Sequence, residues 1–264
     1  MGFDLAGYLR RIGYAGAPRP DRATLEALHF AHATHIPFEN LDILLGRPIR
    51  IDLESIQEKL VRGGRGGYCF EHNLLFAAAL EAAGFRVTRL AGRVRYRTHR
   101  VLPRTHMLLL VQVDGADWIA DVGFGLGGLL LPLPLTAGPA SRQFRWTYRL
   151  AEEPGLWVLQ PHRGGIWEDL YAFSLEPQHL ADYEMANHYV STHPDSRFVQ
   201  TLTAQISTPE TRFMLRNREL TADSGATVSS RTLADGDELL EVLAQTFGLR
   251  FPAGTRFNYR EGVK

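Results

Sequence analysis

The segment HMLLLVQVDGADWIADV, residues 106–122, decides the fold of this chain. Two apolar runs flank Asp114-Gly115, a dipeptide that is typical of the two-residue type I′ turn of a β-hairpin. Such a turn pairs Val113 with Ala116, and counting back from that pair sets the register of the two strands. Apolar residues occur at both the odd-numbered and the even-numbered positions of these strands, so we expect a hairpin that is buried on both faces.

This register brings a histidine and an aspartate together. Asp121 lies opposite Leu108, and His106 lies two residues along the same strand, on the same face as Leu108. Diagonal neighbours on one face are about 7–8 Å apart at the backbone, which an imidazole and a carboxylate can bridge. Because an unpaired buried charge is costly, we expect a hydrogen bond between His106 and Asp121. Such a pair also suits a purely structural role. A catalytic role is indicated only if the chain also provides a nucleophile.

The single cysteine of the chain, Cys69, occurs in RGGRGGYCFEHN at residues 62–73. Its glycines predict a flexible approach, and the residues from Cys69 to Ala83 favour a helix that ends at Gly84. Cys69 therefore begins a helix, where unpaired N–H groups point at the sulfur. The helix dipole stabilises an anion by about 0.3 to 1 kcal/mol, too little to ionise a thiol at neutral pH, so an imidazolium is needed as well.

We interpret Cys69 as a nucleophile, with His106 as its base and Asp121 orienting that base. The alternative for the cysteine is a small buried apolar residue, since free cysteine is among the most often buried types. His72, three residues after Cys69, is the second choice as base, although its helix offers no carboxylate partner. Three histidines, His29, His32 and His35, are spaced by three, but no carboxylate or cysteine recurs with them, and no metal ion is expected.

Composition restricts the class of protein. A hydrophobic fraction of 45% with 22% charged residues in 264 residues indicates a globular chain. Its 29 basic and 29 acidic residues balance, which argues against nucleic acid or an anionic membrane as partner and favours a small-molecule substrate. One cysteine excludes an intramolecular disulfide. We recognise neither a signal peptide nor a spanning segment, so the expected location is the cytoplasm.

Periodicity divides the chain into three parts. Helical spacing over 24–34, over 53–61 and from Cys69 predicts a helical domain at 1–84. Strand periodicity begins at Phe85, and a β domain is expected over 85–195. Short strands and a helix at 237–247, capped by Asp235 and closed by Gly248, predict an α/β unit at 196–264.

Three glycines after the hairpin, Gly123, Gly125 and Gly128, match the dinucleotide-binding pattern GxGxxG. That pattern needs a following helix, which Pro132 and Pro134 preclude. A Rossmann fold is therefore not expected. These glycines instead allow the backbone to approach a ligand beside Asp121, with Phe124 projecting an aromatic surface into the site.

Five motifs occur in order along the chain: IPFENLDI at 36–43, RGGYCFE at 65–71, THMLLLV at 105–111, DVGFG at 121–125 and ST-x-P-x-S-x-F at 191–198. Together they resemble the bacterial arylamine N-acetyltransferases. The resemblance implies an α+β fold with a cysteine-protease or transglutaminase-like core. In it a helical N-terminal domain carries the nucleophile, a β-barrel middle domain carries the histidine and aspartate, and an α/β lid follows.

The resemblance also implies an activity, which is acetyl transfer from acetyl-coenzyme A to an arylamine or arylhydrazine. The reaction is ping-pong and passes through an acetyl-cysteine intermediate. Its partners are small molecules, with neither nucleic acid nor membrane, and the protein is a monomer or homodimer. Three rival interpretations stay open: a thiol hydrolase or transamidase on the same triad, an amide synthase of natural-product assembly, and a non-catalytic binding module.

Roles for further residues follow from the resemblance alone. Phe38, Val94 and Phe124 match positions that line the aromatic acceptor site, for which ordinary core packing is the alternative. Gly125 and Gly127 are the candidate contacts to coenzyme A. Glu39 and Arg65 match positions that make a supporting charged contact near the helix of the nucleophile, a structural role.

Overall fold

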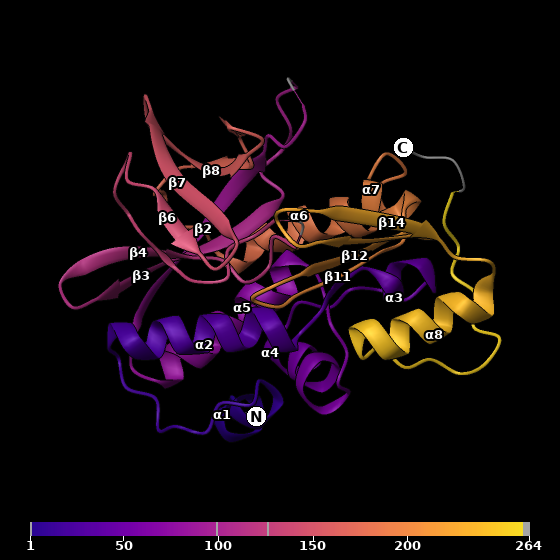
Figure 1. The fold of residues 1–264 in the computed structure, drawn as a ribbon. Coiled ribbons are helices and arrows are strands. Elements are labelled where there is room, and N and C mark those ends of the chain that lie inside the picture. Colours follow the sequence, from indigo (N-terminus) through magenta and orange to yellow (C-terminus); the bar gives the residue numbers. More distant parts are fainter. Residues whose placement is uncertain (1, 99, 126, 261–264) are drawn as a thin grey trace.

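The computed structural model describes residues 2–98, 100–125 and 127–260, so Met1 and the last four residues of the expected 196–264 unit lie outside it. Helices, a curved sheet and a second sheet meet around one central helix (Figure 1). Within the described ranges, none of the helices has the length and apolar character needed to cross a membrane.

The N-terminal part is helical, as expected. Its elements are α1 (Leu5–Arg11), α2 (Arg22–His35), α3 (Leu41–Leu44), α4 (Leu53–Ile56), η1 (Gln57–Arg62) and α5 (Cys69–Ala82). The predicted helices at 24–34 and from Cys69 are confirmed. The predicted helix at 53–61 is wrong in one respect, because only its first turn is α-helical and the rest, η1, is a π-helix.

Helix α5 lies at the centre of the molecule, with buried residues on all sides. Its first turn is closed by Glu71, whose carboxylate accepts a hydrogen bond from the backbone N–H of Tyr68 at 3.0 Å. The preceding glycines allow close packing, where we had expected flexibility. A side chain at Gly66 would collide with the carbonyl oxygen of Pro37, and a Cβ at Gly67 would lie 2.5 Å from the carboxylate of Glu71.

The middle of the chain forms a nine-stranded, nearly closed, barrel-like sheet in the order β5-β4-β3-β2-β10-β8-β7-β6, with β9 paired to β8. Its strands are β2 (Arg86–Val94), β3 (His106–Val113), β4 (Ala116–Ala120), β5 (Leu133–Pro134), β6 (Ser141–Gln143), β7 (Trp146–Glu153), β8 (Leu156–Arg163), β9 (Ile166–Trp167) and β10 (Tyr171–Phe173). A bridge between Ala137 and Leu150 ties the segment after β5 to β7 and draws the ends of the sheet together.

The predicted hairpin register is confirmed. Val113 pairs with Ala116, and Asp114 and Gly115 have φ values of 53° and 76°, as a type I′ turn requires. Both faces are buried, also as predicted. Met107 and its neighbours on one face pack in the core around α5, while Leu108 on the other face packs inside the barrel.

The C-terminal part is a five-stranded sheet in the order β1-β11-β12-β13-β14, with α8 packed against it (Figure 1). The elements are β1 (Phe38–Glu39), β11 (Thr203–Ser207), β12 (Arg212–Arg216), β13 (Glu219–Asp223), β14 (Val228–Thr232) and α8 (Gly236–Phe247). The predicted caps of α8 are confirmed, since the Asp235 side chain accepts from two backbone N–H groups and Gly248 is left-handed at φ 69°.

Two features of this region were not predicted. Helix α6 (Leu180–Thr192) follows the barrel strands inside the segment that we expected to be β, and a short helix α7 (Arg197–Gln200) comes after it. The edge strand β1 comes from the N-terminal part and pairs Phe38 with Gln205. Phe38 therefore lies where the helical part meets the C-terminal sheet.

Candidate active site

The structure brings Cys69, His106 and Asp121 together. His106 Nε2 lies 2.7 Å from Asp121 Oδ2, so the hydrogen bond expected from the hairpin register is present. Cys69, in the first turn of α5, lies close enough to His106 to raise the pKa of that ring, and its Sγ donates to the carbonyl oxygen of Thr105 at 3.6 Å. The three residues are 5%, 3% and 1% exposed, so the site is largely shielded from water.

Charge interactions favour a protonated His106. Burial alone disfavours the imidazolium, but the Asp121 carboxylate and the Cys69 side chain outweigh it and raise the pKa of His106 to about 10. Burial raises the pKa of Asp121, and this is outweighed by His106 and by hydrogen bonds from Asn73 and Gly123, which hold that pKa below its usual value. At neutral pH the pair is therefore an imidazolium and a carboxylate.

Asp121 is held by Asn73, Gly123 and His29, a role that the sequence did not predict for any of them. The Asn73 amide donates to Asp121 Oδ1 at 3.0 Å and to the carbonyl oxygen of Met107 at 2.7 Å. The N–H of Gly123 donates to the same carboxylate oxygen at 2.9 Å, and the N–H of Asp121 donates to His29 Nε2 at 3.1 Å. The sequence did contain a signal for Asn73. Asparagine is a poor helix former, and Asn73 lies four residues after Cys69 and therefore on the same side of the helix as the thiol.

Two aromatic rings enclose His106. Phe124 meets the imidazole edge-on with ring centroids 5.0 Å apart, and Tyr171 approaches it at 4.7 Å. Phe124 and Tyr171 also contact each other at 5.1 Å. Tyr171, in β10 and opposite Val94 of β2, is a second residue that sequence reasoning missed. The rings fix the plane of the imidazole and keep water away from it.

Cys69 and His106 open onto a cavity of about 320 Å³. The residues expected at an aromatic acceptor site, Phe38, Val94 and Phe124, all line this cavity, and Phe198 of α7 contributes another ring beside Phe38 at 5.9 Å. The volume and the aromatic walls suit a small aromatic molecule.

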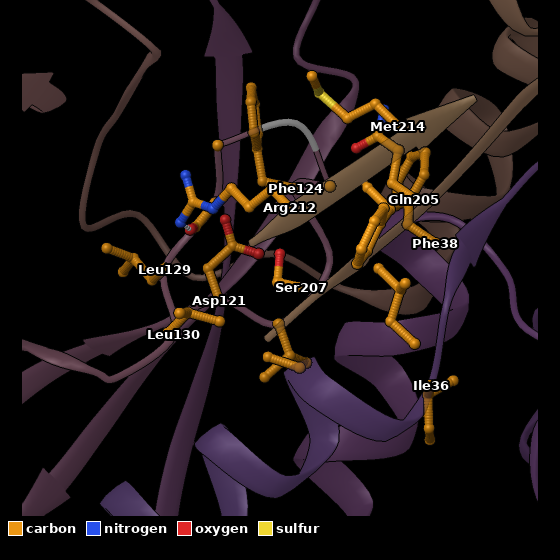
Figure 2. A pocket seen from close by; sticks show the side chains of 17 residues that line it. Ile36, Phe38, Asp121, Phe124, Leu129, Leu130, Gln205, Ser207, Arg212 and Met214 are labelled. Atoms are coloured by element: carbon orange, nitrogen blue, oxygen red, sulfur yellow. Dashed lines mark hydrogen bonds between the residues drawn. The ribbon is translucent and has the colours of Figure 1, made fainter. Parts of the chain in front are cut away.

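Among the described residues, the next element after Asp121 is the strand β5 rather than a helix, which agrees with the expectation that the glycine pattern does not mark a Rossmann fold. Gly125 packs against the ring of Phe38, and an added Cβ there would lie 2.9 Å from it. Gly125 and Gly127 both line a pocket of about 30 Å³, with space for about one water molecule. Figure 2 shows Phe124 and Arg212 on one side of this pocket, with Phe38 and Gln205 on the other.

The other histidines are engaged elsewhere. His72 Nε2 donates to the carbonyl oxygen of Pro37 at 3.2 Å, so its Nδ1 accepts from His32 Nε2 at 2.9 Å. His32 Nδ1 in turn accepts from the Tyr8 hydroxyl at 2.9 Å. Both ring nitrogens of His72 are occupied, which removes it as a rival base. Within the described residues, no group of three or more His, Cys, Asp or Glu side chains is arranged to hold a metal ion.

A buried charge network supports the start of α5. Arg65 Nη2 contacts Glu39 Oε1 at 2.6 Å, which confirms the charged contact expected between these residues. Lys59 bridges Asp42 at 3.0 Å and Glu71 at 2.8 Å. Because Glu71 also closes the first turn of α5, this network fixes the position from which Cys69 projects.

Comparisons with known proteins agree with this geometry. Residues 21–255 match a family described as N-acetyltransferase. An arylamine N-acetyltransferase of Mycolicibacterium smegmatis is 43% identical, and the match covers 94% of this chain and 93% of that protein. The solved arylamine N-acetyltransferase of Salmonella typhimurium superposes with a TM-score of 0.90 at 38% identity, covering 94% of this chain and 92% of that one. The Mycobacterium marinum enzyme in complex with CoA superposes with a TM-score of 0.89 at 36% identity, over 93% and 92%.

Proposed function

The chain belongs to the arylamine N-acetyltransferase family, and from this premise we propose that it transfers acetyl groups by a ping-pong reaction through an acetyl-cysteine on Cys69. Acetyl-coenzyme A is the donor substrate, and an arylamine or arylhydrazine is the acceptor. The observation that carries this proposal is the buried Cys69–His106–Asp121 arrangement opening onto one aromatic-lined cavity.

In the first half-reaction the Cys69 sulfur, as thiolate, attacks the carbonyl carbon of the acetyl thioester. The carbon–sulfur bond to coenzyme A breaks, and the leaving thiolate takes a proton from the His106 imidazolium. A pKa of about 10 for His106 supports this step, because the imidazolium is present at neutral pH to stabilise the attacking thiolate. One thioester replaces another, so the exchange is close to isoenergetic.

In the second half-reaction the acceptor nitrogen attacks the acetyl-cysteine. His106, now neutral, removes a proton from that nitrogen, and the Cys69 thiolate leaves with the imidazolium restored beside it. Asp121 keeps the imidazole in one orientation throughout, through the 2.7 Å hydrogen bond to Nε2. The rings of Phe38 and Phe124 give an aromatic acceptor apolar surface to lie against.

Mass spectrometry after mixing the protein with acetyl-coenzyme A alone tests the intermediate. We expect one added acetyl group on the peptide that contains Cys69, and release of that group when an arylamine is added. The Cys69→Ser variant should fold cooperatively and acquire no acetyl group. An unmodified Cys69, or an acetyl group on another residue, would refute the proposed intermediate.

Consumption of acetyl-coenzyme A with and without an aromatic amine separates acetyl transfer from hydrolysis on the same residues. We expect rapid consumption only when the amine is present. We also infer that the enzyme acts in the cytoplasm, because a free catalytic thiol needs a reducing compartment. Reduced and active enzyme in a cytosolic fraction is the expected result.

A further inference from the structure

A second cavity, of about 670 Å³, lies between the C-terminal sheet and the C-terminal ends of the barrel strands β2 and β8. It adjoins the catalytic cavity, since Tyr96, Arg197 and Gln205 line both. A molecule that reaches Cys69 through the catalytic cavity can therefore extend into this second cavity.

The second cavity is strongly basic. Its walls carry two acidic side chains, Glu219 and Asp223, against five arginines. The arginines are Arg97, Arg163, Arg197, Arg212 and Arg216. In the part of the chain that the structure describes, none of the five forms an ion pair with a carboxylate. Such a wall favours an anion with several charges.

Arg212 is the most deeply placed of these arginines, with 3% exposure. Its guanidinium lies 3.9 Å from the centre of the Trp146 ring, and Nη2 donates to the carbonyl oxygen of Gly128 at 2.8 Å and to the Tyr148 hydroxyl at 2.5 Å. Its Nε and Nη1 are buried without a hydrogen-bond partner among the described residues. A buried cation with two unused donors is costly, and since Nε and Nη1 point in different directions, two separate anionic oxygens would be needed to satisfy them.

Arg163, at the end of β8, reaches the same place from the barrel. A Cβ built on Gly127 would lie 3.5 Å from Arg163 Cζ and 3.6 Å from Arg212 Nη1, so the two guanidinium groups meet over this glycine. Gly127 has a φ of 76°, which disfavours any larger residue, and the Arg163 guanidinium takes up the space that a side chain there would need. The Tyr96 ring is stacked by Arg97 at 5.1 Å and approached by Arg163 at 5.8 Å.

We propose that Arg163 and Arg212, meeting over Gly127, bind phosphate groups of the coenzyme A half of the donor. This inference rests on the proposed function, because it takes the donor to place its thioester at Cys69. Coenzyme A carries a diphosphate and a further phosphate beyond an uncharged arm, so its charged end lies away from the reacting carbon. The Arg163 guanidinium and the unused Nε and Nη1 donors of Arg212 match the several oxygens of such phosphate groups.

The test compares two donors, acetyl-coenzyme A and S-acetylpantetheine, which has the same thioester and arm but no phosphate. The quantity measured is the ratio of kcat/KM for the first donor to kcat/KM for the second. In Arg163→Gln we expect this ratio to fall at least about tenfold, the effect of losing one charge-assisted hydrogen bond. The control Arg62→Gln, which removes an exposed arginine paired with Glu54 and Glu58, should keep the wild-type ratio.

Arg212→Lys is the second variant, because a lysine keeps the charge of this buried site but lacks the separate Nε and Nη1 donors. We expect the ratio to fall here too, while the thermal unfolding midpoint reports whether the fold is kept. If neither Arg163→Gln nor Arg212→Lys lowers the ratio, the inference is wrong. If wild-type protein acetylates an amine from neither donor, the proposed function itself fails, which is a distinguishable result.

Direct binding distinguishes coenzyme A from other phosphate compounds. Calorimetry on Cys69→Ser should show coenzyme A binding that weakens at least about tenfold in the added Arg163→Gln variant. ADP should bind in competition with coenzyme A. If ADP binds without changing the affinity for coenzyme A, the two compounds bind at different sites, and the inference is wrong.

Discussion

The side-chain amide of Asn73 donates to Asp121 Oδ1 at 3.0 Å, four residues along α5 from Cys69. The helix that carries the thiol therefore also holds the carboxylate that orients its base. Asn73 Oδ1 accepts from the N–H of Val122 at 3.2 Å, which ties the end of the hairpin to the same helix turn. One helix face thus sets the spacing of the whole site.

Replacing Asn73 by Ala should lower both activity and stability. Asp121 loses one hydrogen bond, and the carbonyl of Met107 and the N–H of Val122 lose their partners. We expect kcat/KM to fall by about 10- to 100-fold, as for other supporting residues, and the free energy of unfolding by about 1–3 kcal/mol. Urea denaturation and acetyl-transfer assays measure the two effects. The exposed Asn258→Ala serves as control, and equal activity in both variants would contradict this role.

Replacing Asp121 by Asn should lower the pKa of His106 from about 10, because burial then acts without the opposing carboxylate. The folded pKa of His106 is above its ordinary value of 6.5, so the stability gained from this pair is complete below pH 6.5 and is lost as the pH rises towards 10. The pKa of Asp121 is lowered, so its contribution to stability is complete above pH 3.8. The free energy of unfolding of the wild type should therefore exceed that of the variant most between pH 3.8 and pH 6.5, which urea titrations at several pH values will measure. NMR titration of the His106 ring checks the pKa directly, and an unchanged value would contradict the assignment.

Mild acid should destabilise the fold through buried neutral histidines. Burial lowers the pKa of His29 and His72 to about 4, below their ordinary 6.5. Their stabilisation is complete above pH 6.5 and is lost as the pH falls towards 4, at about 1.4 kcal/mol per pH unit for each histidine. His29→Asn should reduce the slope of unfolding free energy against pH in that range. The exposed His188→Asn should leave it unchanged, and equal slopes in the two variants would refute the prediction.

Replacing Val94 by Phe should narrow the acceptor end of the catalytic cavity. Val94 lines that cavity and is paired with Tyr171 of the neighbouring strand β10, so a larger side chain at Val94 takes up part of the 320 Å³. We expect kcat/KM for a two-ring arylamine to fall about tenfold more than for a one-ring arylhydrazine. Val101→Phe, at a position that is 88% exposed, is the matched control. An equal loss for both acceptors would place Val94 outside the acceptor site.

The sequence was sufficient to predict those features whose geometry depends on residues close together in the chain. The Asp114-Gly115 turn sets a register by arithmetic, and that register leads directly to the 2.7 Å contact between His106 and Asp121. The caps of α8 were also readable, because Asp235 and Gly248 act on neighbouring backbone groups. In each case the interacting groups are close in sequence.

The features that were missed depend on distant or ambiguous information. Helix α6 begins at a histidine cap, His179, and leaves Leu180 and Met185 exposed, so it lacks both the usual cap and a clear apolar stripe. The π-helical turn from Gln57 has no signature in a 3.6-residue period. The role of Arg212 could not be predicted for a different reason, since its partner Tyr148 belongs to strand β7 of the other sheet and its partner Gly128 lies in the loop before β5.

Strand β1 has a consequence for how the protein is made. Phe38 finds its antiparallel neighbour in Gln205, and the Asn40 amide bonds the carbonyl oxygens of Phe198 and Thr201. A ribosome must therefore deliver most of the chain before the segment next to the nucleophile's helix can settle. Until then the segment of β1 has no partner strand, and an unpaired strand edge is able to pair with another copy of the chain. Chains that end before β11 would contain the Cys69 thiol but lack the C-terminal sheet that pairs with the segment next to it.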